Sequence, residues 1–419
     1  MNFRFIHAAD VHLDSPLVGL SKYEGAPAEL LRTASRNAFS NLVDRAIEEQ
    51  VDFMVIAGDL YDGDWKDYNT GLFLSREMGR LHREEIPVFI LHGNHDAESE
   101  ITRQLTLPDN VTTFGSRKPE THRIDSLTVA LHGQSFREAA TTENLAADYP
   151  APVDGFFNIG VLHTALEGHA AHANYAPCSV AELRAKGYSY WALGHVHEHR
   201  VVSEEPAIVF PGNLQGRHVR EPGPRGAVLV EARDQGVSLE RLIVDVVRWH
   251  HLEVDVSDAG SLVDAARSVG EALERVVAEH ADGRPLSVRV TLNGRSPAHG
   301  ELFGLEGQLR AEILSLANAL GEDAVWIEKV RVRTEPELDA EQIRARADAV
   351  ADLQVMLERA EQDEELMQAL QSRLSDLVAK APRLLLERVP ELEAVRQGEM
   401  AELVRTVTPG LIARLLSER

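Results

Sequence analysis

Five short polar segments in the first half of the chain carry residues that could bind metal ions. Each follows an apolar run that ends in glycine or in a polar turn, which is typical of a strand and the loop after it. The segments are Asp10-Val11-His12, Gly58-Asp59-Leu60-Tyr61-Asp62, Gly93-Asn94-His95-Asp96, His163 and Gly194-His195-Val196-His197. Because ligands of open α/β sheets collect at the carboxyl edge of the strands, we expect the five segments to meet there.

Together the segments supply enough carboxylate, imidazole and amide donors for two divalent metal ions. Two cations about 3.5–4 Å apart repel each other unless an anion bridges them, and the two oxygens of Asp59 can do so. Asp10 and His12 are separated by one residue, so both can point the same way from an extended segment, and His195 and His197 repeat that spacing. The expected ligands form two sets around the Asp59 bridge: Asp10, His12 and His197 on one metal, and Asn94, His163 and His195 on the other.

This arrangement is suited to hydrolysing a phosphoester. Two cations lower the pKa of a water between them and make it a nucleophile. His95 has no metal to bind in this scheme, so we expect it to protonate the leaving oxygen or to stabilise the phosphoryl group, with Asp96 orienting its ring. Mixed oxygen and imidazole donors suit Mn²⁺, Fe²⁺ or Zn²⁺, of which we expect manganese.

A pair of basic residues follows a later strand candidate. Arg217 and His218, in the segment FPGNLQGRHVRE, either bind a substrate phosphate or belong to a solvated loop. The pattern leaves both interpretations open, and we treat the two residues as candidate substrate-binding groups.

The elements that position these residues alternate between strands and helices. Apolar runs cover 3–10, 51–58 and 87–93, and apolar residues at helical spacing cover 28–49 and 69–83. This order indicates parallel strands covered by helices. Between about 111 and 247 the apolar period shifts towards two, which predicts a second, mixed sheet packed on the first. The expected architecture is a two-sheet sandwich flanked by helices.

The pattern restarts after residue 247 and divides the chain into three parts. Residues 1–247 form the expected catalytic domain, and the order strand–helix–strand–helix–strand over 248–333 predicts a small α+β domain. In 334–419 leucines recur three or four residues apart, which predicts amphipathic helices. These helices either fold on their own domain or form an arm that binds a partner.

Composition limits the classes of function. Hydrophobic residues make up 44% of the 419 residues and charged residues 26%, which excludes a disordered chain. With 43 Lys and Arg against 67 Asp and Glu, the net charge is −24, so any binding to nucleic acid must rest on a local site. No apolar run is long enough for a membrane span, and a single cysteine, Cys178, excludes an internal disulfide. We expect a cytoplasmic protein.

The motifs DxH, GDxxD, GNHD and GHxH, together with His163, resemble those of the calcineurin-like metallophosphoesterase superfamily. They lie between residues 10 and 197. The resemblance implies a four-layer α/β/β/α sandwich and phosphoester hydrolysis at two metals. It also implies the same seven ligands and the same role for His95.

Four further segments resemble the SbcD-type DNA repair exonucleases, in particular their YhaO-type branch. They are AADVHLDSPL, NYAPCSVAEL at 174–183, YWALGHVH and FPGN. This resemblance implies DNA as the substrate, a capping domain over 248–333, a tail that binds an SMC-like ATPase, and a homodimer formed through helices of the catalytic domain. Asp62 departs from the pattern, because nucleases of this group often carry histidine there and a second acid repels a phosphate.

Three functions follow from these observations. The first is a metal-dependent exonuclease that acts on DNA ends, and the second is a phosphodiesterase for a small nucleotide or another diester. The third is a scaffold that recruits an SMC-like ATPase. The intact ligand set argues against a scaffold, which has no need to cluster so many metal-binding groups.

Overall fold

The structure is a computed structural model that describes 2–17, 28–62, 68–97, 107–166, 175–234, 236–321, 323–336, 349–360, 363–380 and short stretches between 392 and 411. The chain divides into two compact units. The first comprises 1–250 and 283–287, and the second comprises 251–282 and 288–419. No helix among the described residues is both long and apolar enough to cross a membrane.

The first sheet of the first unit has six strands in the order β12-β11-β1-β2-β3-β4. The strands are β1 (Asn2–Ala8), β2 (Phe53–Ala57), β3 (Val88–Leu91), β4 (Val111–Thr113), β11 (Gly226–Arg233) and β12 (Gly236–Ile243). β1 to β4 run parallel to one another, whereas β11 pairs antiparallel with β1 and β12 antiparallel with β11. The parallel strands therefore end at one common edge.

The second sheet also has six strands, in the order β5-β6-β7-β8-β10-β9. They are β5 (Glu120–Ile124), β6 (Val129–Gly133), β7 (Phe157–His163), β8 (Tyr190–Gly194), β9 (Arg200–Glu204) and β10 (Ala207–Phe210). The four central strands are parallel, and the edge strands β5 and β9 are antiparallel to their neighbours.

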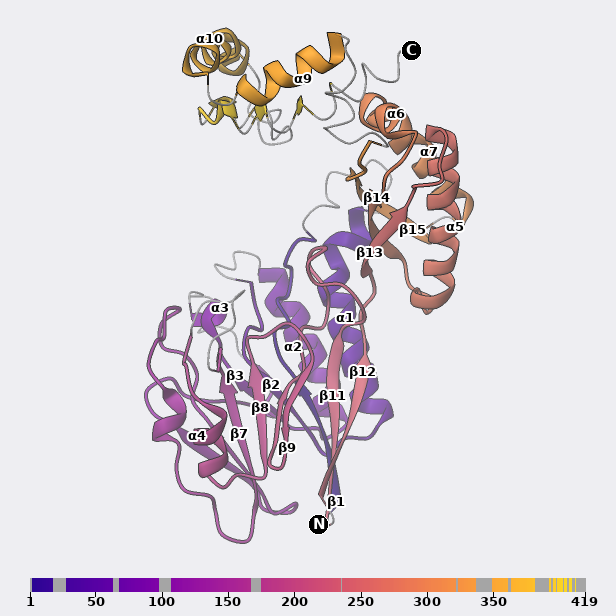
Figure 1. Cartoon of the computed structure of the whole chain (residues 1–419). Helices are drawn as coiled ribbons and strands as arrows, with labels where there is room; N and C mark the ends of the chain where they lie inside the picture. Colours follow the sequence, from indigo (N-terminus) through magenta and orange to yellow (C-terminus); the bar gives the residue numbers. More distant parts are fainter. Residues whose placement is uncertain are drawn as a thin grey trace. The chain divides into compact units, whose positions relative to one another are not determined.

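Alternating side chains of the strands build the layers of the first unit (Figure 1). Met54 of β2 packs with residues of α1 (Ala28–Glu48) and α2 (Tyr68–Arg83), which cover the outer face of the first sheet. Its neighbour Phe53 points to the opposite face and stacks on Phe5 between the two sheets, at a ring distance of 4.8 Å. Trp191 of β8 packs outward with Leu183 of α4 (Val180–Ala185). These layers confirm the expected α/β/β/α sandwich.

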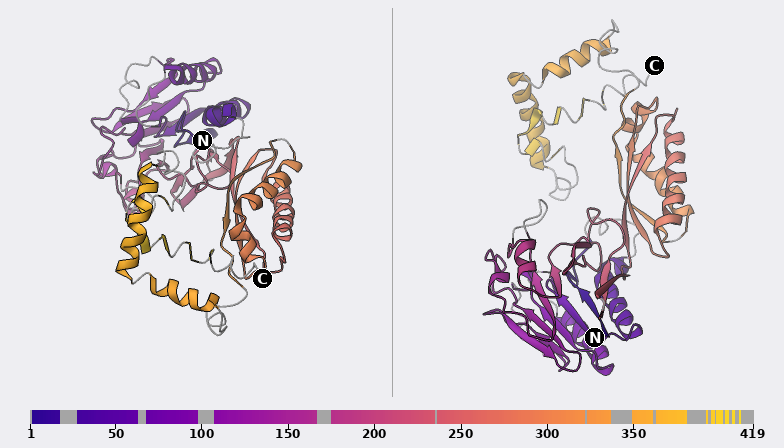
Figure 2. Two further views of the ribbon diagram at one scale, coloured as in Figure 1. Left: turned by 90° about the horizontal axis from the view of Figure 1, so that it is seen from above. Right: turned by 60° about the horizontal axis from the view of Figure 1, so that its bottom comes forward.

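The second unit contains a three-stranded sheet in the order β13-β14-β15. The elements around this sheet are β13 (Arg248–Asp255), α5 (Leu262–His280), β14 (Leu286–Asn293), α6 (His299–Gly304), α7 (Glu306–Ala319) and β15 (Val325–Val332). The first residues of β13 and of β14 belong to the first unit. Figure 2 shows α5 and α7 along one face of this sheet. α5 carries a stripe of buried apolar residues at helical spacing, among them Ala265, Val269 and Leu273, which explains that packing.

Two helices are described beyond this sheet, α9 (Ala349–Ala360) and α10 (Glu364–Lys380). Val378 of α10 packs with Val395 and Met400 in a small apolar cluster. Most residues after 380 lie outside the described part of the chain, so the helical tail over 334–419 stays a prediction there.

The apolar period predicted one sheet from the segment 111–247, but the strands of this segment belong to two sheets. β4, β11 and β12 belong to the first sheet, because β11 pairs with β1 from the far end of the segment. Such a pairing joins residues far apart in the chain and leaves no mark on the local pattern.

Candidate metal centre

The loops after five strands meet where the two sheets end together. The backbone N–H of Asp10 donates to the carbonyl of Gly58 at 3.0 Å, which joins the loops after β1 and β2. The backbone N–H of His195, at the end of β8, donates to both carboxylate oxygens of Asp10 at 3.0 Å. His163 Nδ1, at the end of β7, lies 3.0 Å from the carbonyl oxygen of Ala57. Hydrogen bonds therefore join the ends of the first and second sheets at the predicted edge.

The backbone of these loops adopts conformations that L residues rarely occupy. Four of the seven predicted ligands have positive φ: Asp10 at 50°, His12 at 45°, Asp59 at 52° and His195 at 101°. Each such residue costs on the order of 1 kcal/mol, and strain of this kind concentrates at functional sites.

Glycines make the close approach of the two sheet ends feasible. A Cβ on Gly58, which has a φ of 99°, would collide with the ring of His163. A Cβ on Gly194 would collide with the carbonyl oxygen of Ala57. Space beside the site requires both glycines, and the positive φ of Gly58 also favours glycine there.

One cluster of donors contains Asp10, His12 and His197. Their ligand atoms lie within 4.8 Å of one another, and Nε2 of His12 lies 3.2 Å from Nε2 of His197. Asp10 and His12 are almost fully buried, at 0% and 1% exposed. These are the three residues that the sequence predicts for the first metal.

A second cluster contains Asp59, His163 and His195, again with ligand atoms within 4.8 Å of one another. Oδ1 of Asn94 lies 3.0 Å from Nε2 of His163, so Asn94 belongs to this group as well. Oδ2 of Asp59 lies 3.5 Å from Nε2 of His163 and 3.9 Å from Nε2 of His12. Asp59 therefore stands between the two clusters.

The groups around His163 require a positive charge beside its Nε2. Its Nδ1 must carry a proton, because the carbonyl of Ala57 can only accept. In the neutral ring, Nε2 then turns its lone pair towards Asn94 Oδ1 and Asp59 Oδ2, which are acceptors too. A positive charge between these atoms resolves the conflict, and a divalent metal ion fits this donor set.

The pKa shifts of Asp10 and Asp59 agree with the need for a positive charge at this place. Burial raises the pKa of Asp10 to about 6. Burial acts in the same direction on Asp59, but the imidazoles of His163 and His12 outweigh it and hold the pKa of Asp59 well below its usual range. Asp59 in turn outweighs the effect of burial on His163 and raises the pKa of that ring to about 9. Without a metal, a proton on His163 supplies the missing positive charge.

His95 lies at the mouth of the centre with its side chain 37% exposed. Its backbone N–H donates to Oδ1 of Asp59 at 3.0 Å, and its ring stands 5.0 Å from the ring of His12. The carboxylate nearest to its Nδ1 is Asp62 at 3.6 Å. His12, Asp62 and His95 form a third group with ligand atoms within 4.8 Å of one another.

Asp96 performs a different task from the one expected of it. Its carboxylate accepts the backbone N–H groups of Gly93 at 2.9 Å, Tyr61 at 2.9 Å and Leu60 at 3.2 Å. It thereby fixes the loops that carry Asn94 and Asp59. The structure places Asp62, three residues after Asp59, beside His95 instead.

Comparison with known proteins places the chain in a family. Residues 3–199 match the calcineurin-like phosphoesterase family, and residues 249–335 match the middle domain of the metallophosphoesterase YhaO. The chain is 33% identical over 340 residues to a protein of Bacillus subtilis described as an uncharacterized metallophosphoesterase, YhaO; the match covers 80% of this chain and 82% of that protein. The chain belongs to the calcineurin-like metallophosphoesterase family.

A further relative and a solved structure show lower identity to the chain. The DNA double-strand break repair protein Mre11 of Methanopyrus kandleri is 26% identical over 334 residues, which cover 72% of this chain and 68% of that protein. A solved structure of a dimetal phosphatase from Danio rerio matches 58% of this chain and 98% of its own, at 11% identity and a TM-score of 0.35.

Arg217 of this metallophosphoesterase also lies beside the candidate metal centre. Its Nη1 donates to Oδ1 of Asp62 at 3.2 Å, so the guanidinium offsets the acidic charge that departs from the nuclease pattern. Nε2 of the next residue, His218, lies 3.7 Å from Oε1 of Glu221, and burial lowers the pKa of His218. The structure thus places Arg217 beside the predicted metals and His218 against Glu221.

Sequence reasoning missed Glu221. Its Oε1 accepts from Nδ1 of His197 at 2.7 Å, and its Oε2 accepts from Nδ2 of Asn213 and from the backbone N–H of Arg217. Because Nδ1 carries the proton, Nε2 would be the atom of His197 that binds a metal. A single acidic residue in the loop after β10 carries no local signal of this contact.

Proposed function

We propose that this metallophosphoesterase hydrolyses phosphodiester bonds of DNA, starting at DNA ends, with two bound manganese ions. The position of Asp59 carries the proposal, since one of its oxygens faces an imidazole of each cluster, His12 at 3.9 Å and His163 at 3.5 Å. This is the placement that a bridge between two cations requires.

The residues divide the work between binding and proton transfer. The ligand sets would be Asp10, His12 and His197 for one ion, Asn94, His163 and His195 for the other, with Asp59 shared. Two ions held there polarise phosphoryl oxygens and lower the pKa of a water between them. His95, exposed at the mouth, donates a proton to the leaving oxygen, and Asp62 orients its ring.

DNA is the proposed substrate because a relative is named as a DNA double-strand break repair protein. The ion pair of Arg217 with Asp62 also supports it, since that pair reduces the repulsion of a phosphate. The alternative is a small nucleotide or another diester. The net charge of −24 favours this alternative, because a long polyanion is repelled more strongly than a small one.

The proposed partners follow from the resemblance to the SbcD-type exonucleases. We propose that 334–419 bind an SMC-like ATPase and that the first unit pairs with a second copy of the chain. A scaffold without catalysis is the remaining alternative, and measuring the metal content of the purified protein separates it from an enzyme.

The test is hydrolysis of linear DNA and of bis-(p-nitrophenyl) phosphate by the Mn²⁺-loaded chain. We expect nucleotides to be released from DNA ends. Asp59→Asn should lose activity by about 10²-fold or more together with bound metal. His95→Gln should lose about 10²- to 10⁴-fold while it retains both metals. Asp154→Asn, an exposed turn residue, is the matched control and should behave as the unaltered chain.

Each alternative has its own outcome in this assay. Hydrolysis of bis-(p-nitrophenyl) phosphate without DNA cleavage would identify a small-diester phosphodiesterase. Less than about one metal per chain after loading would identify a scaffold. Equal activity of Asp59→Asn and the unaltered chain would refute the metal assignment.

A further inference from the structure

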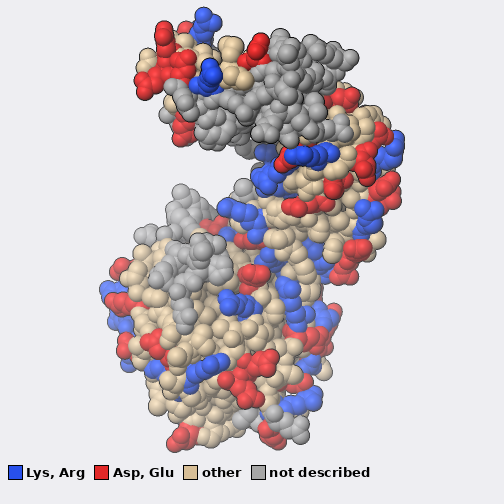
Figure 3. All heavy atoms as spheres, viewed as in Figure 1, with Lys and Arg blue, Asp and Glu red and all other residues tan. Residues whose placement is uncertain are grey.

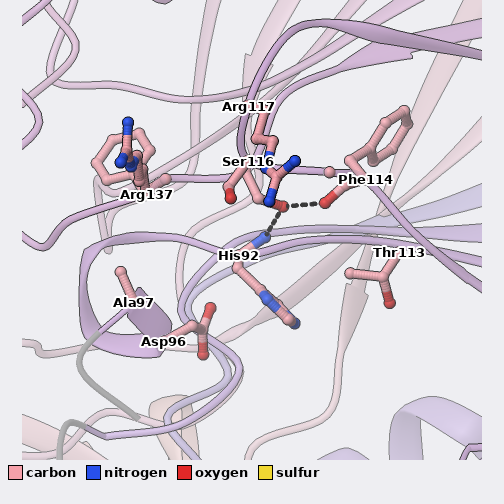
Figure 4. Close-up of a pocket in the computed structure, with 11 residues that line it drawn as sticks. His92, Asp96, Ala97, Thr113, Phe114, Ser116, Arg117 and Arg137 are labelled. Carbon is pink, nitrogen blue, oxygen red and sulfur yellow. Dashed lines mark hydrogen bonds between the residues drawn. The ribbon is translucent and has the colours of Figure 1, made fainter. Parts of the chain in front are cut away.

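A cavity of about 830 Å³ opens beside the metal centre (Figure 4). Its walls come from the loops after β3, β4 and β6, so it lies at the same edge of the sheets as the predicted ligands. Two arginines line it, Arg117 and Arg137, together with His92 and Ser116. We call this cavity the arginine pocket. Its volume is within the range of sites for small ligands, about 300–1,000 Å³.

The pocket adjoins the candidate metal centre. Phe136, which lines the pocket, packs edge-on against the predicted ligand His163 at a ring distance of 5.4 Å. His92 and Asp96, also lining residues, flank Asn94 and His95 in the chain. The pocket therefore lies next to side chains that are proposed to hold a metal ion.

Hydrogen bonds between the loops hold the pocket in shape before a ligand binds. Oγ of Ser135 donates to the carbonyl of Phe114 at 2.6 Å and accepts the backbone N–H of His92 at 2.9 Å, as the dashed lines of Figure 4 show. The backbone N–H of Phe136 donates to the carbonyl of His92 at 2.9 Å. These bonds tie the loops of both sheets together, so little ordering is needed when a ligand binds.

The two arginines have positive charge available for a ligand. Both side chains are exposed, and within the described part of the chain no carboxylate oxygen lies within 4.0 Å of either guanidinium. The acids nearby are already engaged. Asp96 accepts three backbone N–H groups, and Glu120 accepts the backbone N–H of Gly115 at 2.8 Å.

We propose that the arginine pocket binds a phosphate group of the substrate other than the one that is hydrolysed. Guanidinium groups bind phosphate oxygens through charged, often bidentate hydrogen bonds. In a DNA strand this group is either a neighbouring backbone phosphate or a terminal 5′-phosphate. The proposal rests on the proposed function, because it assumes that the scissile phosphate lies at the metals.

The first test measures binding without metal. Octathymidylate labelled at its 3′ end, with and without a 5′-phosphate, is titrated with the chain in EDTA and followed by fluorescence anisotropy. We expect the double variant Arg117→Gln/Arg137→Gln to bind about tenfold more weakly. Equal weakening for both strands would indicate a backbone phosphate, and loss of a preference for the phosphorylated strand would indicate a terminal one.

The control is Lys118→Gln, which removes one positive charge from an exposed neighbour that does not line the pocket. The proposal is wrong if the double variant binds both strands as the unaltered chain does. It is also wrong if Lys118→Gln weakens binding equally, or if the unaltered chain does not bind the strands.

A second measurement separates the pocket from the metal chemistry. Bis-(p-nitrophenyl) phosphate has a single phosphate and nothing for the pocket to hold. The double variant should therefore hydrolyse it at the rate of the unaltered chain, while its KM for the oligonucleotide rises. Failure of the unaltered chain to hydrolyse bis-(p-nitrophenyl) phosphate would count against the proposed function, whereas the binding titration would still decide the pocket.

Discussion

At the scale of residues, the two clusters are shaped by groups that fix the protons of the imidazoles. The carbonyl of Ala57 accepts a hydrogen bond from Nδ1 of His163, and Glu221 accepts one from Nδ1 of His197. Each bond turns the other ring nitrogen towards the centre. Groups that orient ligands in this way commonly change metal affinity by about 10- to 100-fold when they are removed.

Glu221 offers a test at this scale. Glu221→Gln replaces the charged acceptor of His197 with a neutral amide, so we expect Mn²⁺ affinity at one of the two sites to fall by about 10- to 100-fold. The second site should keep its affinity, because its nearest ligands do not contact Glu221. Isothermal titration calorimetry with Mn²⁺ measures both sites independently of activity.

Glu204→Gln, an exposed residue of β9, is the matched control and should titrate as the unaltered chain. Glu221→Asp should restore part of the lost affinity, because it returns the charge. Unchanged titration of Glu221→Gln would show that Glu221 does not position His197.

At the scale of elements, β1 contributes to the junction of the sheets as well as to the metal centre. His7 of β1 is fully buried between them, with Nδ1 2.9 Å from the hydroxyl of Tyr190 and Nε2 3.1 Å from the carbonyl of Leu193. Burial lowers the pKa of His7 to about 3, against 6.5 for an exposed ring. The ring is therefore neutral in the folded protein at neutral pH.

This shift predicts how stability depends on pH. Below pH 6.5 the unfolded chain protonates His7 and the folded chain does not, so the free energy of unfolding falls as pH decreases towards 3. His7 alone should account for about 2–3 kcal/mol between pH 6.5 and 4.5. Urea unfolding in EDTA should show a smaller loss over this range for His7→Gln than for the unaltered chain.

His82→Gln removes an exposed histidine of α2 and is the matched control, expected to keep the full pH dependence. Parallel curves for His7→Gln and the unaltered chain would contradict the prediction. Carboxylates that titrate in the same range are common to all three proteins and cancel in the comparison.

The sequence predicts the elements that carry the ligands better than it predicts the sheets to which they belong. The run 51–58 contains β2 and the run 87–93 contains β3, because buried central strands leave continuous apolar runs. β5 was not predicted, since an edge strand with partly exposed residues lacks such a run. The return of β11 to β1 depends on a distant pairing that no local pattern records.

The same limit applies to the site. The seven predicted ligands follow strand ends, so topology alone indicated that they would meet. Glu221, Asp62 beside His95 and the arginine pocket depend on how loops cross in space. Local spacing gives no information about those crossings.

At the scale of the whole molecule, charge is spread over the surface. Figure 3 shows acidic and basic side chains interspersed on the visible face of each unit. A net charge of −24 disfavours binding of DNA by general attraction. Under the proposed function, recognition of DNA must then come from local positive groups, namely the proposed metals, Arg217 and the arginine pocket. We expect the binding of DNA to depend on these groups more than on any broad basic face.

The central claim is that two metal ions share Asp59. Crystals of the chain grown with Mn²⁺, measured at the manganese absorption edge, locate the ions by anomalous scattering. The account predicts two peaks about 3.5–4 Å apart on either side of the Asp59 carboxylate, one beside His12 and one beside His163. A single peak, or peaks away from Asp59, would contradict it.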